Sequence, residues 1–439
     1  MKTKLWNKNF TLAYVGMIIS AIGGVGLNLA ISVVVFQETK STILSAVFTL
    51  LSMIPQFVLP LVMGPIIDRK NPLKVLVTNE IILAFIFFAA AFASWKVGFN
   101  YGMYAAFSVL ISGFEVVSML AGSSVIPQIM SKEHYVKGNA AINVIYPLCS
   151  VLITPVAMLL FNRFGFPLIL AAYGVTSLID ASLESRIKAK FEYIEKKSEG
   201  LADYVKDLKE GFRYFKNDRA VFAVFLCFTL VMFADSSSSV LLYPFFERSA
   251  TLSDQQYALL NSIRSAGYLL GGFLHYFIKI PDSKRYRIAV AVYFVFVLLD
   301  STVFFMPYWM MCASRFLLGV LGMNSANIRV SAIQAHVPNT YRAKLNAFFS
   351  ILVTAASMIG TPIVGALGEF LPYGIIQVGF QMAYLVGILV FILPPKNNVR
   401  ELYNYSTQCE PPALPAVDMQ EGDGQHTESM QAACDTQDT

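Results

Sequence analysis

Charged residues, histidine, tryptophan and cysteine are all scarce in this chain of 439 residues. Asp, Glu, Lys and Arg together make up 14% of the sequence, whereas 56% of it is hydrophobic and the mean hydropathy is +0.58. In typical soluble domains about a quarter of all residues are charged. The shortage of charge therefore excludes an ordinary soluble protein and indicates a chain that lies largely in lipid.

The few histidines and cysteines are scattered, and this scatter excludes several kinds of site. The cysteines show no paired spacing, so we expect neither a disulfide framework nor a zinc site. The sequence also lacks a Gly-x4-Gly-Lys-Ser/Thr phosphate loop and a His-Glu-x-x-His motif. We therefore expect no enzyme, no cofactor, no bound metal and no ATP-driven pump. Nucleic acid is not an expected partner either, because the basic residues lie between hydrophobic runs.

Long hydrophobic runs are abundant in the sequence. A helix needs about 20 apolar residues to cross a bilayer, and runs of this kind predict twelve spans. They cover residues 10–36, 42–64, 75–95, 101–126, 141–161, 166–183, 220–244, 257–278, 288–306, 308–328, 345–367 and 373–394. The first run is too long for the hydrophobic core of a cleavable signal peptide. The sequence thus predicts an all-α integral membrane protein.

Lys and Arg gather in the loops on one side of these spans. The loops on the other side hold only Lys40, Lys96, Arg163 and Arg248, whereas most of the 33 Lys and Arg residues, Arg329 among them, lie in the remaining loops. Cytoplasmic loops of membrane proteins carry the excess of positive charge. We therefore expect a multi-pass protein of the inner (plasma) membrane with both termini in the cytoplasm.

The chain also repeats itself at a fixed offset without a gap. Matching positions include Ser124 and Ser331, Lys137 and Lys344, Asn139-Ala140 and Asn346-Ala347, and Thr154-Pro155 and Thr361-Pro362. Such a cluster indicates two parallel six-helix halves. The expected organisation is an N-terminal half (1–185), a cytoplasmic connector (186–219), a C-terminal half (220–395) and a disordered cytoplasmic tail (396–439).

A charged loop separates the second and third spans. It reads Gly64-Pro-Ile-Ile-Asp68-Arg69-Lys70-Asn71-Pro72-Leu-Lys74. Four of its residues, Gly64, Asp68, Arg69 and Lys74, match the signature loop of the major facilitator superfamily, and the chain resembles that family over nearly all of its length to residue 395. The resemblance implies the major facilitator fold, with two pseudo-symmetric six-helix halves. It also implies that Asp68 faces the start of the eleventh helix and latches the halves in one state.

Within that family the chain is similar to the bacterial drug-efflux branch, which includes macrolide-efflux proteins and enterobactin exporters. This finer resemblance rests on Asn9-Phe10, Ile126-Pro127, Glu133, Asn139-Ala140, Gly211-Phe-Arg-Tyr, Val337-Pro338 and Arg342. Two features of the branch are replaced. The Gly-Asp pair of the first helix is Gly23-Gly24, and the glycine-rich pattern of the fifth helix is reduced to Pro155.

Four ionisable residues of the C-terminal half fall inside predicted spans, where they are costly and therefore candidates for a site. Counting about 1.5 Å per residue along each helix places Asp235 level with Arg264, and Asp300 level with Arg315. Two interpretations stay open. The pairs are structural ion pairs, as we expect for Asp300 and Arg315, or Asp235, Arg264 and Arg315 contact the substrate.

Glu115 lies near the middle of the fourth span, with no Lys or Arg at its depth in the N-terminal half. A carboxyl group without a cationic partner in a low-dielectric medium favours its neutral form, so Glu115 is the candidate for proton coupling. The alternative is a structural, protonated glutamate that hydrogen-bonds to Asn28 or Ser20. By resemblance, helices 1, 4, 7 and 10 line the cavity, which adds Asn28, Asp235 and Arg315 as cavity candidates.

Two Thr-Pro pairs occur at equivalent positions of the fifth and eleventh spans. Proline inside a membrane helix removes a backbone hydrogen bond, and neighbouring threonines can compensate for it. We therefore expect helix kinks at Pro155 and Pro362.

The function that we expect is secondary active transport by alternating access. The chain is predicted to be a monomer that exports amphipathic small molecules, drug-like or macrolide-like, in exchange for protons or another cation across the lipid bilayer. Two alternatives stay open: import or export of a metabolite, siderophore or lipid on the same fold, and a membrane sensor that transports nothing.

Overall fold

The computed structural model describes residues 5–67, 70–189, 209, 211–277 and 280–404. Twelve long helices account for most of them, and no strand occurs in these ranges. The first six are α1 (Lys8–Thr39), α2 (Thr42–Ile67), α3 (Pro72–Val97), α4 (Tyr101–Ile129), α5 (Tyr135–Phe164) and α6 (Phe166–Glu184). The other six are α8 (Arg219–Arg248), α9 (Asp254–Phe277), α10 (Asp282–Ser301), α11 (Tyr308–His336), α12 (Asn339–Leu367) and α13 (Tyr373–Gly387). Short segments are η1 (Lys132–His134), η2 (Val303–Phe305), η3 (Ile388–Ile392), η4 (Pro395–Asn397) and α14 (Val399–Asn404).

Each predicted span coincides with one of the long helices. Ten of them are long and apolar enough to cross a membrane, and the two that fall short are α9 and α10. The physical reason is composition: α10 opens with a run of charged residues, and α9 is rich in Asn, Gln and Ser. The periphery of the helices exposes large apolar side chains such as Phe85, Phe92 and Trp95. A surface of this kind suits contact with lipid.

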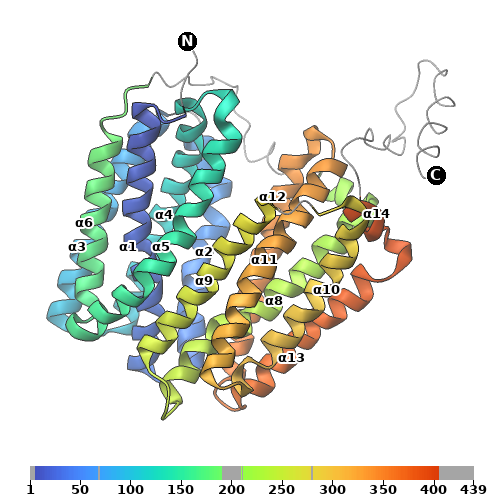
Figure 1. The fold of residues 1–439 in the computed structure, drawn as a ribbon. Helices are drawn as coiled ribbons and strands as arrows, with labels where there is room; N and C mark the ends of the chain where they lie inside the picture. The colour runs from blue at the N-terminus through green and yellow to red at the C-terminus, as the bar shows by residue number, and fades with distance from the viewer. Residues whose placement is uncertain (1–4, 68–69, 190–208, 210, 278–279, 405–439) are drawn as a thin grey trace.

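The helices form two groups, α1–α6 and α8–α13, that lie side by side (Figure 1). The start of α1 and the short helix α14 both lie in the upper half of Figure 1, α14 at its right. We call this upper side the termini side, and the side of the α1–α2 connection the opposite side. The two groups diverge toward the termini side and converge toward the opposite side (Figure 1).

Glu369, two residues after the end of α12, joins the two groups on the opposite side. Its carboxylate accepts hydrogen bonds from the backbone NH of Ile43 (3.0 Å) and from the hydroxyls of Ser41 (2.7 Å) and Thr42 (3.1 Å), at the start of α2. Burial alone raises the pKa of Glu369, but these hydrogen bonds outweigh burial and lower its pKa below the ordinary value. The carboxylate thus serves as a cap for a helix of the other half.

Two further polar contacts between the halves lie nearby. The Lys40 ammonium is 2.5 Å from the Glu247 carboxylate, and the Gln37 amide donates to Asp254 (3.1 Å). The first residue of each pair belongs to the N-terminal group, and the second to the C-terminal group. These contacts hold the halves together on the opposite side.

Helix α14 corrects the expected start of the disordered tail. The sequence predicts that residues 396–404 belong to that tail. In the structure Val399, Leu402 and Tyr403 are instead buried against the C-terminal group, and the Tyr403 hydroxyl is 2.8 Å from that of Tyr293. The reason is the spacing of the three apolar side chains, which puts them on one face of a helical turn. Residues 405–439 lie outside the described residues.

The N-terminus of α8 is fixed by Asp218, just outside the span. Its carboxylate accepts hydrogen bonds from the backbone NH groups of Ala220 and Val221 (both 3.1 Å) and lies 2.7 Å from Nε2 of His336 at the end of α11. Burial alone raises the pKa of Asp218, but the contact with His336 and the backbone hydrogen bonds outweigh it and lower the pKa below its ordinary value of 3.8.

Removing this cap should destabilise the fold in a pH-dependent way. We expect Asp218→Ala to lower the free energy of unfolding by about 1–2 kcal/mol, and Asp218→Asn, which can still cap, to cost less. Because the pKa is lower in the folded state, the ionic contribution is present above the ordinary pKa of 3.8 and is lost as the pH falls through the folded value. Thermal unfolding in detergent at neutral and at acidic pH tests this. Equal unfolding temperatures for Asp218→Ala and the parent at neutral pH contradict it.

Candidate functional site

A cavity of about 720 Å³, which we call the acidic cavity, lies within α1–α6, from the middle of the helices toward the termini side. Its volume falls in the range of about 300–1,000 Å³ that is usual for small-molecule sites. Four carboxyl side chains line it: Glu80 of α3, Glu115 of α4, and Asp180 and Glu184 of α6. No Lys or Arg is among the residues that line this cavity.

Three of the four carboxyl groups in this acidic cluster are buried and incompletely hydrogen-bonded. Glu80, Asp180 and Glu184 are 4–5% exposed, and each has one carboxyl oxygen without a hydrogen-bond partner in the described part of the chain. Glu80 interacts electrostatically with the other three carboxyl groups. Since like charges disfavour one another at short range, the cluster is suited to take up a proton or another cation. Within the described ranges, no three Asp, Glu, His or Cys side chains are placed to hold a metal ion.

Sequence reasoning identified only Glu115 of this cluster, and its hydrogen-bond partner in the structure differs from the two, Asn28 and Ser20, offered for the structural alternative. The hydroxyl of Tyr173 donates to Glu115 (3.3 Å), whereas Asn28 donates to the Tyr146 hydroxyl (3.4 Å). The other carboxylates could have been found, because Glu80 and Asp180 fall inside the predicted spans 75–95 and 166–183. The criterion applied to Glu115 applies equally to both.

Glycines in α1 bring that helix against α6 and so shape the cavity wall. A Cβ added to Gly16 would overlap the Asp180 carboxylate, and one added to Gly23 would overlap the ring of Tyr173. The next glycine, Gly24, has more room, since its Cβ would lie 3.4 Å from the Tyr173 hydroxyl. The close approach thus explains Gly23 at the place where the drug-efflux branch has the first residue of its Gly-Asp pair.

Two alanine substitutions should separate close approach from helix propensity. We expect Gly16→Ala to lower the free energy of unfolding by about 1–3 kcal/mol, because the methyl group displaces the Asp180 carboxylate. Gly24→Ala should be neutral or slightly stabilising, since Ala is the better helix former. Thermal unfolding of both purified variants is the measurement. A larger loss in Gly24→Ala than in Gly16→Ala would refute the assignment of Gly16 to the close contact.

A second pocket of about 280 Å³ lies on the opposite side, between α1, α2, α4 and α8. Its polar lining includes Gln56, Ser112 and Tyr243. Glu115 and Asn28 line both this pocket and the acidic cavity. Glu115 therefore lies at the junction between a cavity of the termini side and a pocket of the opposite side.

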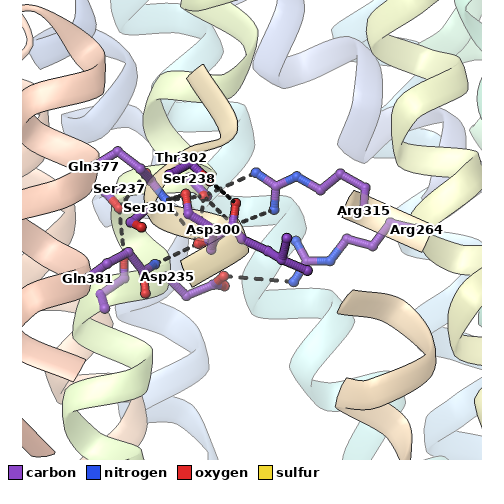
Figure 2. A network of polar contacts seen from close by, with 12 residues as sticks. Asp235, Ser237, Ser238, Arg264, Asp300, Ser301, Thr302, Arg315, Gln377 and Gln381 are labelled. Carbon is purple, nitrogen blue, oxygen red and sulfur yellow. Dashed lines mark hydrogen bonds and ion pairs between the residues drawn. The ribbon is translucent and has the colours of Figure 1, made fainter. Parts of the chain in front are cut away.

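The four charged residues predicted in the C-terminal half all line one cavity of about 250 Å³ within that half. Nη1 of Arg315 lies 2.9 Å from the Asp300 carboxylate, and both side chains are almost fully buried. Nη2 of Arg264 lies 3.7 Å from Asp235, and these side chains are 29% and 44% exposed. The structure thus places each acid beside the base expected from its depth (Figure 2), with one pair closed and the other open.

Uncharged side chains complete the environment of Asp300. Its carboxylate accepts hydrogen bonds from the amides of Gln377 (2.9 Å) and Gln381 (2.6 Å) and from the hydroxyl of Ser238 (3.2 Å). Ser238 in turn accepts a hydrogen bond from Arg315 (3.2 Å) (Figure 2). Gln377 and Gln381 carry no charge, and no feature of the sequence distinguishes them from other polar residues of the span. The network gives Asp300 the satisfied surroundings of a structural ion pair.

A family model described as Major Facilitator Superfamily matches residues 13–245 and 224–401. The chain belongs to the major facilitator superfamily. It is therefore a multi-pass integral membrane protein, and its family consists of transporters rather than enzymes. Comparison with curated protein sequences gave no significant match.

Solved structures of facilitator transporters share the fold. A mutant form of the nucleoside transporter NupG is 16% identical, with a TM-score of 0.66 over 88% of this chain and 100% of that one. A bacterial homologue of the iron transporter ferroportin, in an inward-facing state, is 16% identical, with a TM-score of 0.65 over 90% and 98%. A D-xylose–proton symporter is 13% identical, with a TM-score of 0.64 over 88% and 97%. At such identities the likeness shows the fold alone.

The signature loop of this facilitator transporter is only partly described. Gly64 lies in the last turn of α2, and Lys74 lies in the first turn of α3, where its NH donates to the side chain of the N-cap Asn71 (3.1 Å). Asp68 and Arg69 lie outside the described residues. The contact of Asp68 with the other half stays a prediction.

The two prolines lie inside helices that continue past them. Pro155 is in α5 and Pro362 is in α12. The Pro155 carbonyl accepts a hydrogen bond from the Gln255 amide of the other half (3.1 Å). Pro155 thus lies at a contact between the halves of the transporter, and the kinks themselves stay predictions.

Proposed function

We propose that this transporter exports amphipathic small molecules in exchange for protons, by alternating access. The observation that supports the proposal most is the place of Glu115. Its side chain lines the acidic cavity of the termini side and the pocket of the opposite side. A carboxyl group at that junction can exchange protons with one side in one state and with the other side in the other state.

The charges of the loops support a cytoplasmic termini side. Described residues there include Arg186, Lys188, Lys284 and Arg285, whereas the opposite side holds few cations. Under the positive-inside rule, the termini side faces the cytoplasm. The contacts of Glu369, Lys40 and Gln37 then close the transporter toward the outside, so the state described here is the one that loads substrate from the cytoplasm.

Proton exchange through Glu115 provides a route for coupling. When the outer side is open, Glu115 takes up a proton from the pocket lined by Gln56 and Tyr243. When the cytoplasmic side is open, the proton leaves through the acidic cavity, where Asp180 and Glu184 lie toward the end of α6. Export follows if substrate and proton bind in alternate states, because the inward proton gradient then drives the outward step.

Amphipathic compounds suit the acidic cavity best. Its walls include Met17, Leu83 and Tyr146 beside the four carboxyl groups, so an apolar body and a polar or cationic group both find partners. The resemblance to the drug-efflux branch favours drug-like or macrolide-like substrates. The protein is proposed to work as a monomer.

Transport in inside-out membrane vesicles tests the proposal. Vesicles energised by respiration should accumulate a macrolide or another amphipathic drug from a panel, and an uncoupler should abolish the accumulation. Vesicles without the transporter are the control. Accumulation that persists with the uncoupler would contradict proton-driven export. Transport of every compound of the panel only into the cell, and never out of it, would contradict it as well.

A further inference from the structure

The cavity of the C-terminal half carries more positive than negative charge. Three arginines, Arg264, Arg315 and Arg329, line it together with two aspartates, Asp235 and Asp300. Arg315 and Asp300 neutralise each other at 2.9 Å in a buried network. The remaining charges are two guanidinium groups and one carboxylate, so the open part of the cavity has an excess of one positive charge.

Arg329 is the least expected of these residues. The sequence placed it in a loop beyond a span that ended at 328, whereas α11 continues to His336 and puts Arg329 in the cavity wall. The polar residues between Asn324 and His336 end the apolar run but not the helix. Its guanidinium lies 3.7 Å from the ring centroid of Phe228 and 5.4 Å from that of Phe349.

Arg329 also lacks an ionic partner among the described residues, where none of the salt bridges includes it. Arg264 has a weak one, at 3.7 Å from an Asp235 side chain that is 44% exposed. A cation at membrane depth is costly unless it faces a partner or water. Arg329 thus has no counter-ion to displace in the described part of the chain and Arg264 has only a distant one, so both guanidinium groups can bind an anion that enters the cavity.

The repeat gives an independent view of these charges. At the offset that aligns Ser124 with Ser331, Gly122 aligns with Arg329 and Glu115 with Gly322. Each member of these pairs lines the cavity of its own half. The equivalent cavities are thus acidic in the N-terminal half and basic in the C-terminal half. Where one half has Glu115 or Arg329, the other half has a glycine at the matching position.

We propose that the C-terminal cavity is a subsite for an anionic group, a carboxylate or a phosphate, of the transported amphiphile. Arg329 and Arg264 bind the anion, and the apolar body extends toward the larger cavity of the N-terminal half. The planar guanidinium fork matches carboxylate and phosphate oxygens better than an ammonium does. At about 250 Å³ the cavity has room for a headgroup rather than for a whole drug. This inference rests on the proposed transport of amphiphiles and names the chemistry of one end of the substrate.

A pair of probes that differ only in charge tests the subsite. A dansylated undecanoic acid and its methyl ester are titrated against the full chain in phosphatidylcholine nanodiscs, with dansyl fluorescence as the readout. The acid should bind about tenfold more tightly than the ester, the gain expected from a charge-assisted contact. Arg329→Gln and Arg264→Gln should each reduce the affinity for the acid to within about twofold of the affinity for the ester. Arg329→Lys should keep part of the preference for the acid. Arg287→Gln, at an exposed position of α10 outside the cavity lining, is the matched control.

Competitors separate the sources of the anion. Displacement of the acid by phosphatidylglycerol in the nanodisc assigns the subsite to a lipid headgroup, and displacement by inorganic phosphate assigns it to a soluble anion. Equal affinity of acid and ester for the parent protein overturns the proposal without any variant, as does an unchanged preference in both glutamine variants. The binding assay involves no proton gradient. Failure of the binding experiment therefore does not contradict proton-driven export. Conversely, if the uncoupler does not abolish transport, the protein can still prefer the acid in the binding experiment.

Discussion

Glu115→Gln is expected to reduce proton-driven accumulation of substrate in inside-out vesicles by about 100-fold. This factor is near the upper end of the range of about 5–150-fold that coupling between two sites usually gives. Glutamine keeps the size of the side chain and can still accept the hydrogen bond from the Tyr173 hydroxyl. It cannot carry a proton between the two cavities that Glu115 lines. The substitution therefore removes the coupling and leaves the fold in place.

Two controls make this result specific. Exchange of labelled for unlabelled substrate without a proton gradient should persist in Glu115→Gln, because exchange needs the cavity but not the coupled proton. Glu401→Gln, at an exposed position of α14, should transport like the parent. Full coupled accumulation by Glu115→Gln would remove this residue from the mechanism, and a loss of exchange as well would show a structural rather than a coupling role.

The second large effect concerns the buried pair of Arg315 and Asp300. Arg315→Gln or Asp300→Asn should lower the free energy of unfolding by about 3–5 kcal/mol, since each leaves one buried charge without its partner. The remaining charge keeps only the neutral contacts of Ser238, Gln377 and Gln381. Thermal unfolding in detergent, with recovery of monodisperse protein as a second readout, measures the loss.

A double substitution tests whether the cost comes from the unpaired charge. Arg315→Met combined with Asp300→Leu removes both charges and fills the space, so it should be more stable than either single variant. The pair of Asp235 and Arg264 serves as the contrast. Asp235 is half-exposed, so Asp235→Asn should lower the free energy of unfolding by less than about 1 kcal/mol. Equal losses in Asp235→Asn and Asp300→Asn would contradict the distinction between the two pairs.

The spans, the repeat and the partners of the C-terminal charges could be predicted because each follows from residue positions along the chain. Apolar runs of a fixed length mark the spans, and depth along the membrane follows from the residue count. That count placed Asp235 with Arg264, and Asp300 with Arg315. Lateral position is different, because it depends on which helix faces are packed against one another.

Lateral packing is what the sequence could not supply. Glu115, Asp180 and Glu184 gather around Glu80 because α3, α4 and α6 face one another there. The close approach of α1 to α6 at Gly16, beside Asp180, is likewise a contact that no periodicity reveals. Gln377 and Gln381 escaped notice for another reason. They are uncharged, and their importance comes only from the Asp300 carboxylate that they face. Arg329 was misplaced because its helix outlasts the apolar run that was used to define the span.

Alternating access requires the two halves to rock about a shared pocket, so that one side closes as the other opens. Pulsed electron–electron distance measurements on spin labels test this in a background without native cysteines. One pair of labels replaces Glu38 and Ala250 on the opposite side, and the other replaces the repeat-related Asn139 and Asn346 on the termini side. On addition of a transported drug at acidic pH, the distance across the opposite side should lengthen while the distance across the termini side shortens. Distances that change together, or that do not respond at all, would contradict the account.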